Sequence, residues 1–206
     1  GDMSQRREPA AIVRCPWPGI ADPDYARYHD AEWGVPLADD LRLFEKMVLE
    51  GFQSGLSWLT ILRKRDNFRR AFHGFDAKRI ASYGARDVAR LMGDAGIVRN
   101  RLKIEATIDN ARAYLALSQR EPFARFVWGF APEPAASARA AHGDIPAATD
   151  ASKALSKALK KEGFRFVGPT TMYAFMQSVG MVNDHLVSCH RHGPCAKAQA
   201  RFRRPR

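Results

Sequence analysis

A histidine and a cysteine lie one helical turn apart in the segment NDHLVSC, residues 183–189. His185 and Cys189 are four positions apart, so on a helix their side chains share one face and can bind one ligand. With six histidines and three cysteines in 206 residues, such a spacing arises by accident in about one sequence in ten. A metal site therefore requires two further ligands elsewhere in the chain.

Another cysteine and histidine occur near the N-terminus, in the segment CPWPGIADPDYARYH, residues 15–29. A zinc ion shared by Cys15, His29, His185 and Cys189 would fasten this segment to the C-terminal part of the chain. Two thiolates and two imidazoles form a closed tetrahedral site, which is structural because it leaves no position for a catalytic water.

The spacing leaves other ligand sets open. His190, His192 and Cys195 follow directly in SCHRHGPC, residues 188–195, and each carries a metal-binding atom. A buried thiol beside hydrogen-bonded histidines, with no metal at all, is the alternative interpretation. Spacing alone does not decide among these possibilities.

The charge of the chain favours an anionic partner. Lysine and arginine number 33 against 22 aspartates and glutamates, which gives a net charge of +11 and a pI of about 10.0. A nucleic-acid backbone is the most common partner of such an excess. Part of it lies in RFRRPR and QRR at the two ends, so solubility or nonspecific adhesion is the alternative.

Cysteine content and hydropathy indicate a cytoplasmic protein that does not enter a membrane. Three cysteines do not build a disulfide framework, no segment has the pattern of a signal peptide, and no apolar run reaches the roughly 18 residues that span a bilayer. The opening GDM has the character of a cloning remnant before Met3.

Almost every patterned segment has a helical period, which predicts an all-α protein. Helices are expected over residues 39–52, 57–74, 101–119, 152–163 and 168–180. The first should bury a stripe of Leu41, Phe44, Val48 and Phe52. Asp39 and Ser57 are expected N-caps, and Pro169 suits a first helical turn. The first 35 residues and residues 130–150 are expected to be irregular, and we assign no function to the second stretch.

Five blocks of this sequence resemble the 3-methyladenine DNA glycosylase I family: YHDAEWGVP (28–36), LEGFQSGLSW (49–58), DAGIVRNRLKI (94–104), ASKALSKALKKEGFRFVG (151–168) and MVNDHLVSC (181–189). The resemblance extends from Arg14 to about Gly193. It implies an all-helical fold of the helix-hairpin-helix DNA glycosylase superfamily with one structural zinc. In that family the zinc ligands correspond to Cys15, His29, His185 and Cys189.

The resemblance also implies a domain organisation. Residues 14–193 would form a single glycosylase unit of two helical lobes whose termini are joined by zinc. Residues 1–13 would be the cloning remnant and an N-terminal tail, and residues 194–206 a basic C-terminal tail.

The same resemblance implies a binding site for the damaged base. Tyr28 and Trp58 match the stacking aromatics, Glu50 matches the catalytic-site carboxylate that recognises the base, and Trp17 is expected to help wall the pocket. Aromatic faces and a carboxylate suit 3-methyladenine because methylation at N3 makes the base cationic. The alternatives are core packing for Tyr28 and Trp58, and a solvated position near a helix C-terminus for Glu50.

Two further segments could contact DNA. Gly55 and Leu56 lie at an expected tight turn before Ser57, where Leu56 could wedge into the gap left by a flipped nucleotide; packing of Leu56 in the core is the alternative. The segment LMGDAGIVRNR, residues 91–101, is expected to be a hairpin between two helices.

In that hairpin, glycines would let the backbone approach a phosphate, and basic side chains would add charge. The residues concerned are Gly93, Gly96, Arg99, Arg101 and Lys103.

The resemblance implies a monomeric, monofunctional enzyme that flips 3-methyladenine out of alkylated double-stranded DNA and excises it by hydrolysis, leaving an abasic site. The sequence nominates no residue that activates the water. One alternative is a zinc-stabilised DNA-binding module that recognises damage without catalysis. A second is a small-molecule enzyme with a basic surface, which would lack salt-dependent affinity for DNA.

Overall fold

The structure is a computed structural model that describes residues 11–134 and 138–206. These residues fold into helices, with one isolated bridge between Arg139 and Leu186 and no strand. The α-helices are α1 (Pro23–Ala31), α2 (Asp40–Gln53), α3 (Trp58–Ala71), α4 (Ala77–Ala81), α5 (Ala85–Met92), α6 (Arg101–Ser118), α7 (Phe123–Trp128), α8 (Asp150–Lys161), α9 (Pro169–Ser178) and α10 (His192–Arg201). Two short 3₁₀ turns are η1 (His73–Phe75) and η3 (His142–Asp144). The all-α prediction is confirmed.

The expected N-caps and the expected place of Pro169 are confirmed. The Asp39 carboxylate accepts from the N–H of Arg42 at 2.9 Å, and the Ser57 hydroxyl accepts from that of Thr60 at 3.2 Å. Each bond satisfies an amide that has no partner within its helix. Pro169 occupies the first turn of α9, where its missing N–H has no consequence.

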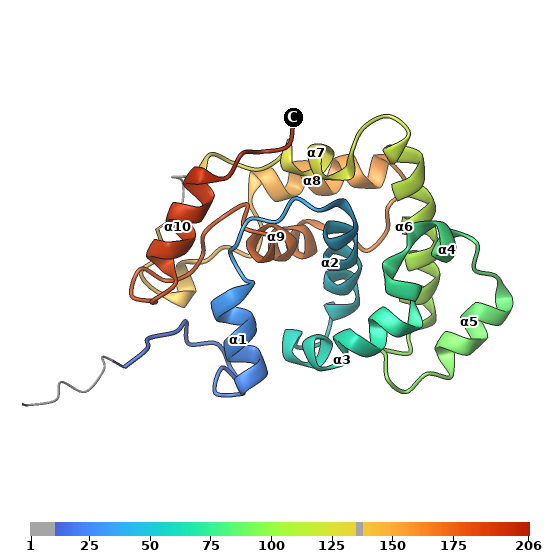
Figure 1. The fold of residues 1–206 in the computed structure, drawn as a ribbon, viewed down its shortest axis with the longest axis horizontal. Helices are drawn as coiled ribbons and strands as arrows, with labels where there is room; N and C mark the ends of the chain where they lie inside the picture. Colours follow the sequence, from blue (N-terminus) through green and yellow to red (C-terminus); the bar gives the residue numbers. More distant parts are fainter. Residues whose placement is uncertain (1–10, 135–137) are drawn as a thin grey trace, which may run out of the picture.

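Helix α2 lies at the centre of the fold and packs against α3, α6, α7 and α9 (Figure 1). Phe44, Val48 and Phe52 are buried on it as predicted. Leu41 is a correction to the predicted stripe, because it is 46% exposed. It lies in the first turn of α2, where helical periodicity continues past the edge of the core.

The N-terminal region corrects the expectation of an irregular first 35 residues, since it contains α1. Asp22 caps this helix by accepting from the N–H groups of Asp24 and Tyr25, and Pro23 opens its first turn. Helix α1 buries only Tyr28 and His29, so it has no apolar stripe that a sequence pattern would reveal. It places these two side chains toward two different sites, described below.

The basic C-terminal segment is also more ordered than a tail. Most of residues 194–206 belong to α10, on which Cys195 and Gln199 are buried. The Gln199 amide donates to the carbonyls of Gly34 and Val182 at 2.9 and 3.0 Å. Phe202 then packs on Trp128, with 4.6 Å between the ring centroids. These contacts tie the end of the chain to the body of the fold.

The described residues between 130 and 150 are mostly irregular, as expected, apart from η3. Residues 1–10, which include the expected cloning remnant and QRR, lie outside the described residues, as do residues 135–137. Within the described ranges, no helix combines the length and the apolar character that crossing a bilayer requires.

Candidate active site and metal centre

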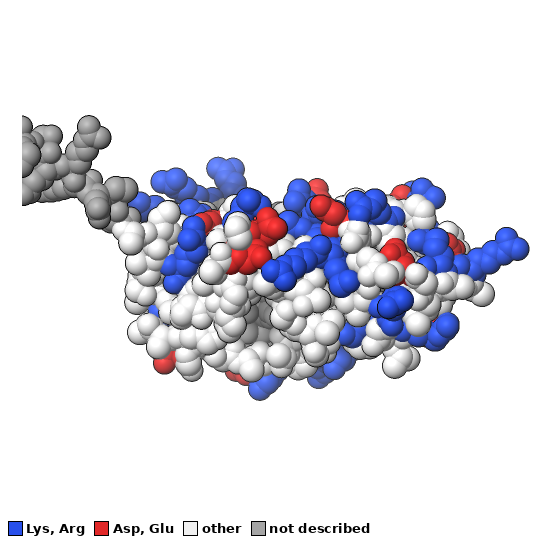
Figure 2. Space-filling model, turned by 90° about the horizontal axis from the view of Figure 1, so that it is seen from below, with Lys and Arg blue, Asp and Glu red and all other residues white. Residues whose placement is uncertain are grey.

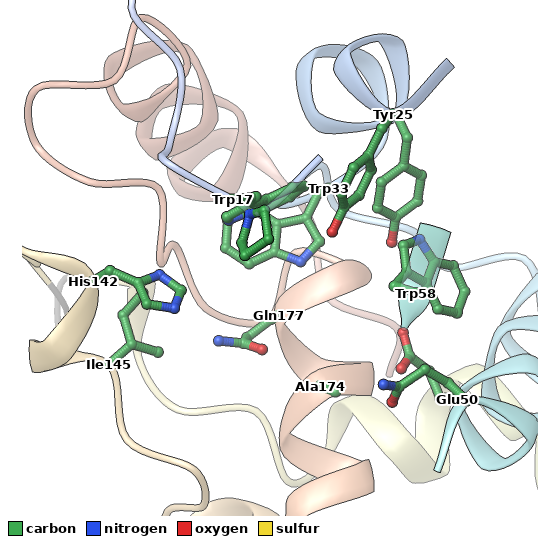
Figure 3. Close-up of a pocket in the computed structure, with 12 residues that line it drawn as sticks. Trp17, Tyr25, Trp33, Glu50, Trp58, His142, Ile145, Ala174 and Gln177 are labelled. Carbon is green, nitrogen blue, oxygen red and sulfur yellow. The ribbon is translucent and has the colours of Figure 1, made fainter. Parts of the chain in front are cut away.

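One cavity brings together side chains from α1, α2, α3 and α9 (Figure 3). Its volume is about 270 Å³, close to the roughly 300 Å³ at which small-molecule sites begin. The walls are mainly aromatic, with a few polar groups. The lining residues are Trp17, Pro18, Tyr25, Tyr28, Trp33, Glu50, Gln53, Trp58, His142, Ile145, Ala174 and Gln177.

The four residues that the sequence assigned to a base-binding site all line this cavity. Tyr28 and Trp58 lie beside each other, with ring centroids 5.4 Å apart and planes tilted by 40°. Trp17 stands edge-on to Trp33, at 4.8 Å between centroids. Tyr28 is buried as a core aromatic would be, yet its ring borders an open space that can accept a ligand.

Glu50 lies in the last turn of α2 with only 5% of its surface exposed. A solvated position at a helix end is therefore not what the structure shows. Burial raises the pKa of Glu50 to about 7, while the Lys46 ammonium and the Ser178 hydroxyl oppose part of that rise. A buried carboxylate facing an aromatic cavity is suited to hydrogen-bonding a polar, positively charged ligand.

Several lining residues were not singled out from the sequence. Tyr25 lies one turn before Tyr28 on the same face of α1, a spacing that could have been noticed. His142 and Ile145 come from the 130–150 stretch, for which the sequence indicates no function, and they lie across the cavity from Trp58 (Figure 3). The tertiary fold brings these two residues to the cavity, and a local sequence pattern does not predict such a contact.

The sequence pattern also does not indicate that Lys46 is buried. Lys46, one turn before Glu50 on α2, is 8% exposed. Its ammonium donates to the Tyr28 hydroxyl at 3.0 Å. Tyr28 and Glu50 line the cavity, whereas Lys46 lines a separate pocket, so its ammonium contacts Tyr28 from outside the cavity.

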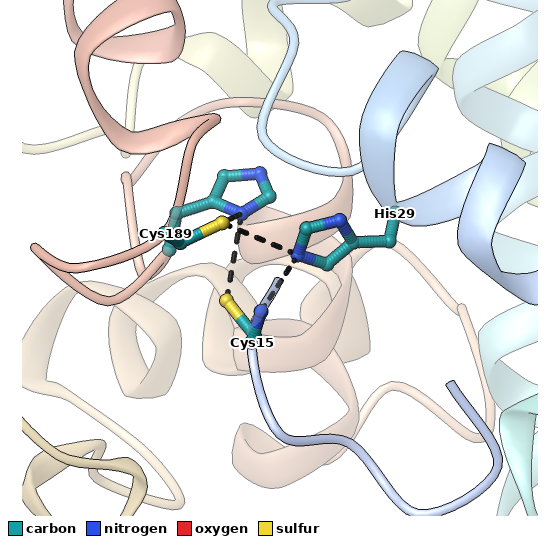
Figure 4. Close-up of side chains that lie close together, drawn as sticks. Cys15, His29 and Cys189 are labelled. Carbon is teal, nitrogen blue, oxygen red and sulfur yellow. Dashed lines mark hydrogen bonds between the residues drawn. The ribbon is translucent and has the colours of Figure 1, made fainter. Parts of the chain in front are cut away.

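A second site gathers the cysteines and histidines that the resemblance implied (Figure 4). Cys15, His29, His185 and Cys189 are all buried, and their ligand atoms all lie within 4.8 Å of one another. The Sγ atom of Cys189 lies 3.5 Å from His29 Nε2 and 3.5 Å from His185 Nδ1, and Cys15 Sγ lies 3.6 Å from His185 Nδ1.

These separations fit a tetrahedral metal centre. Zinc–sulfur bonds of about 2.3 Å and zinc–nitrogen bonds of about 2.0–2.1 Å give a sulfur–nitrogen edge of about 3.6 Å. The outer nitrogens of the two imidazoles are also engaged: His29 Nδ1 with the Asp30 carboxylate at 2.8 Å, and His185 Nε2 with the Trp33 carbonyl at 2.8 Å. These bonds turn the remaining nitrogen of each ring toward the cluster, as in metal sites.

The other candidate ligands have different contacts. His190 Nε2 contacts the Asp30 carboxylate at 2.9 Å, and His192 Nδ1 donates to the His185 carbonyl at 2.9 Å. Cys195 is buried, with its sulfur 4.0 Å from the Trp33 carbonyl. His190 does approach His29 and Asp30 in a smaller group. The four-residue cluster is the one built from two thiols and two imidazoles.

The cysteine–histidine cluster adjoins the cavity. Trp17 stands edge-on to His29, and Trp33 stands edge-on to His185, each at 4.8 Å between ring centroids. Both tryptophans line the cavity. Fixing the two imidazoles therefore also fixes one wall of the cavity.

The turn between α2 and α3 has the expected form. Gly55 has a φ of 80°, in the left-handed region that glycine adopts without strain. The Gln53 amide donates to the Leu56 carbonyl and closes the turn. Leu56 is 39% exposed, so it is not the core residue of the alternative interpretation.

The expected hairpin joins α5 to α6. Gly93 follows the end of α5, and the Gly96 N–H donates to the Asp94 carboxylate at 2.8 Å. A Cβ on Gly96 would lie 3.0 Å from the Asn67 side chain, so the close approach to α3 favours glycine here. Arg99 and Arg101 are exposed beside this turn.

Lys103 is a correction to the expected DNA-binding set. It is buried, and its ammonium donates to the carbonyls of Phe52 and Ser54 at 2.9 and 2.6 Å. These carbonyls lie at the C-terminal end of α2, where a cation is favourable. Lys103 therefore stabilises the α2 terminus that carries Glu50.

Figure 2 shows the face formed by the lower side of the molecule in Figure 1, where α1, α3 and α5 lie. This face is hollowed near its centre, and lysine and arginine side chains gather along it, with fewer acidic ones between them (Figure 2). On α3, Arg63 pairs with Asp22, the N-cap residue of α1, at 2.7 Å.

Comparison with known proteins is consistent with this geometry. The family model described as methyladenine glycosylase matches residues 17–192. DNA-3-methyladenine glycosylase 1 of Escherichia coli strain K12 is 54% identical over 180 residues, covering 86% of this chain and 96% of that relative. DNA-3-methyladenine glycosylase of Haemophilus influenzae is 50% identical over 185 residues, covering 89% and 97%.

Solved structures agree in fold. A crystal structure of 3-methyladenine DNA glycosylase I superposes with a TM-score of 0.84 at 52% identity, covering 87% of this chain and 100% of that one. A Staphylococcus aureus structure, described as the structural basis of 3-methyladenine recognition, gives 0.79 at 37% identity, covering 83% and 92%. The chain therefore belongs to the methyladenine glycosylase family and is an enzyme, a DNA glycosylase.

Proposed function

We propose that this protein excises 3-methyladenine from alkylated DNA by hydrolysing the bond between base and sugar, which leaves an abasic site. The observation that carries the proposal is the meeting of Tyr28, Glu50 and Trp58 on one cavity. Relatives that are 50% and 54% identical bear the name DNA-3-methyladenine glycosylase, which supports the same substrate here.

Recognition of the base would follow from charge and shape. A base inside a duplex must be flipped out before it can enter a closed pocket. Methylation at N3 gives adenine a positive charge, and the faces of Tyr28 and Trp58 attract cations more strongly than neutral bases. The Glu50 carboxylate would accept hydrogen bonds from the polar edge of the base and would complement its charge.

The reaction needs little acid catalysis, because the cationic base leaves the sugar as a neutral molecule. The protein would contribute mainly by extracting the base, orienting it and excluding water from its faces. Lys46 does not line the cavity, so it is not placed to attack the sugar as a Schiff-base nucleophile. This agrees with a monofunctional glycosylase.

We also propose that Cys15, His29, His185 and Cys189 hold one zinc ion. With four protein ligands the ion would be structural, and its contribution would be to fasten the N-terminal segment to the loop before α10. Burial lowers the pKa of both His29 and His185, which keeps the imidazoles neutral as metal ligands must be. Burial also raises the pKa of the Cys15 thiol to about 12. A cation at this site would favour the thiolates.

For DNA contact, we propose that Leu56 fills the gap left by the flipped nucleotide and that Arg99 and Arg101 contact phosphates. Leu56 is a large apolar side chain partly exposed at a closed turn, which is the character of a wedge. The two arginines are exposed beside the α5–α6 hairpin. Such contacts bind DNA without reading its sequence. Action as a monomer and location in the cytoplasm stay predictions.

The test of the proposed function is release of free base from a methylated DNA duplex, measured by chromatography with the purified protein and with Glu50→Gln. The wild-type protein should release 3-methyladenine and leave sites that alkali cleaves, and the variant should release far less. A DNA-binding module without catalysis would bind the duplex and release nothing. A small-molecule enzyme would show no salt-dependent affinity for the duplex.

A further inference from the structure

The ammonium of Lys46 occupies a position that the proposed function does not use. It lies 4.5 Å from the ring centroid of Tyr28 and 4.5 Å from that of Trp58. It also donates to the Tyr28 hydroxyl at 3.0 Å. Both rings line the cavity, whereas Lys46 lines a separate pocket with residues such as Glu32 and Ser178. The ammonium therefore contacts the base-binding aromatics from outside the cavity, and burial lowers its pKa to about 8.

The charges around this ammonium leave Glu50 as its natural partner. Glu32, which follows α1, pairs with Arg65 of α3 at 2.8 Å, and Glu45 of α2 pairs with Arg69 at 2.6 Å. Among the described residues, neither Lys46 nor Glu50 has an ion pair within 4.0 Å. They are four positions apart on α2, a spacing at which opposite charges attract.

Other groups facing Glu50 are weaker influences. Tyr25 and Tyr28 of α1 are neutral at ordinary pH, since burial raises the pKa of both phenols. Ser178 of α9 offers a hydroxyl. From the far side of the cavity come His142 and the neutral amide of Gln177. Of these groups, the Lys46 ammonium is the one whose positive charge lowers the pKa of Glu50 against the effect of burial.

We propose that Lys46 is a positioning residue of the base-binding site, which holds the Tyr28 ring in place and keeps the Glu50 carboxylate in its charged form. This inference rests on the proposed function, because it assigns Lys46 a role in preparing the same cavity for a cationic base. The hydrogen bond fixes the Tyr28 hydroxyl, and the ring contacts fix the angle between Tyr28 and Trp58.

The position of Lys46 outside the cavity affects the ionisation of Glu50. A carboxylate buried without a cation takes up a proton and ceases to complement a cationic base. Lys46 supplies that cation without entering the space that the base requires. The expected consequence is that the site stays competent at a lower pH than it would with a neutral residue at position 46.

The test is a direct measurement of Glu50 ionisation by NMR, using protein labelled with ¹³C at the glutamate carboxyl groups. Glu50→Gln assigns the resonance. Lys46→Met removes the charge and keeps an unbranched side chain, and Lys46→Arg keeps the charge. Arg42→Met is the matched control, because it removes an exposed cation one turn earlier on α2.

We expect Lys46→Met to raise the pH of half-ionisation of Glu50 by about one unit or more. Lys46→Arg should remain near the wild type, and Arg42→Met should not shift it. In base release, the acid limb of kcat/KM should move upward by the same amount in Lys46→Met and return in Lys46→Arg. A shift in Lys46→Met no larger than that in Arg42→Met would overturn the proposal.

Separate results would contradict the proposed function and the proposed role of Lys46. If the wild-type protein releases no 3-methyladenine, the proposed function is wrong, and the NMR titration still decides whether Lys46 controls the charge of Glu50. If base is released but the Lys46→Met titration matches that of Arg42→Met, the function stands and the role of Lys46 is wrong.

Discussion

Replacing Glu50 by glutamine should weaken activity while making the fold more resistant to unfolding at alkaline pH. Glutamine keeps the size and hydrogen-bonding capacity of the side chain but never ionises. Burial raises the pKa of Glu50 from its ordinary 4.5 to about 7. The folded chain therefore holds this proton more tightly than the unfolded chain does.

The sign of the pH dependence follows from that difference. The stability that the protonated side chain contributes is fully present below about pH 4.5 and is lost as the pH rises through about 7. At about 1.4 kcal/mol per pH unit, the loss between pH 5 and pH 8 is about 2–3 kcal/mol. Glu50→Gln has no such loss, so its stability relative to the wild type should rise by this amount across the interval.

The assay is urea unfolding of the wild-type protein, Glu50→Gln and Glu133→Gln, each at pH 5 and pH 8. Glu133 is exposed, so its variant controls for the loss of one carboxylate. Effects of pH on the metal site are shared by all three proteins and cancel in the comparison. A pH-independent difference between Glu50→Gln and the wild type would refute the buried charge on which recognition of a cationic base depends.

Three further predictions concern the other elements. Cys189→Ser should lose bound zinc and lower the unfolding temperature together, whereas Cys195→Ser should keep its zinc; elemental analysis and calorimetry measure both, and full zinc content in Cys189→Ser would contradict the ligand assignment. Leu56→Ala should slow base release from duplex DNA several-fold and change the free energy of unfolding by no more than about 0.5 kcal/mol. An unchanged rate of base release in Leu56→Ala would contradict the proposal that Leu56 fills the gap left by the flipped nucleotide. Lys103→Met should lower the free energy of unfolding by about 1–3 kcal/mol because it leaves buried carbonyls unpaired, whereas Arg99→Met should reduce the salt dependence of DNA binding by about one ion. If Lys103→Met instead reduced the salt dependence of DNA binding and Arg99→Met lowered the free energy of unfolding, the roles assigned to the two residues would be wrong.

The helical frame was largely readable from the sequence because its signals are local. Asp39 and Ser57 are capping residues at the start of apolar periodic runs, and both cap as expected. The helices that were not predicted include the short α4 and α7 as well as α1 and α10. The last two carry few and unusual buried side chains. His29 on α1 faces the metal cluster, and Gln199 on α10 bonds to backbone carbonyls. Neither pattern resembles an apolar stripe.

The candidate site was readable only in part. Spacing indicated His185 with Cys189 and offered Cys15 and His29 as further ligands. The family resemblance was needed to choose this set over His190, His192 and Cys195. Burial of a lysine depends on tertiary neighbours, so the contacts of Lys103 with the end of α2 could not be foreseen. The same holds for Lys46 behind Tyr28. His142 reaches the cavity from a stretch that carries no periodic signal.

The central claim is that Tyr28, Glu50 and Trp58 form one receptor for a cationic purine. A crystal structure of the protein with 3-methyladenine tests it most directly. We predict the base in the cavity, against the rings of Tyr28 and Trp58 and within hydrogen-bond distance of the Glu50 carboxylate. A base bound elsewhere, with those three side chains making no contact to it, would contradict the account.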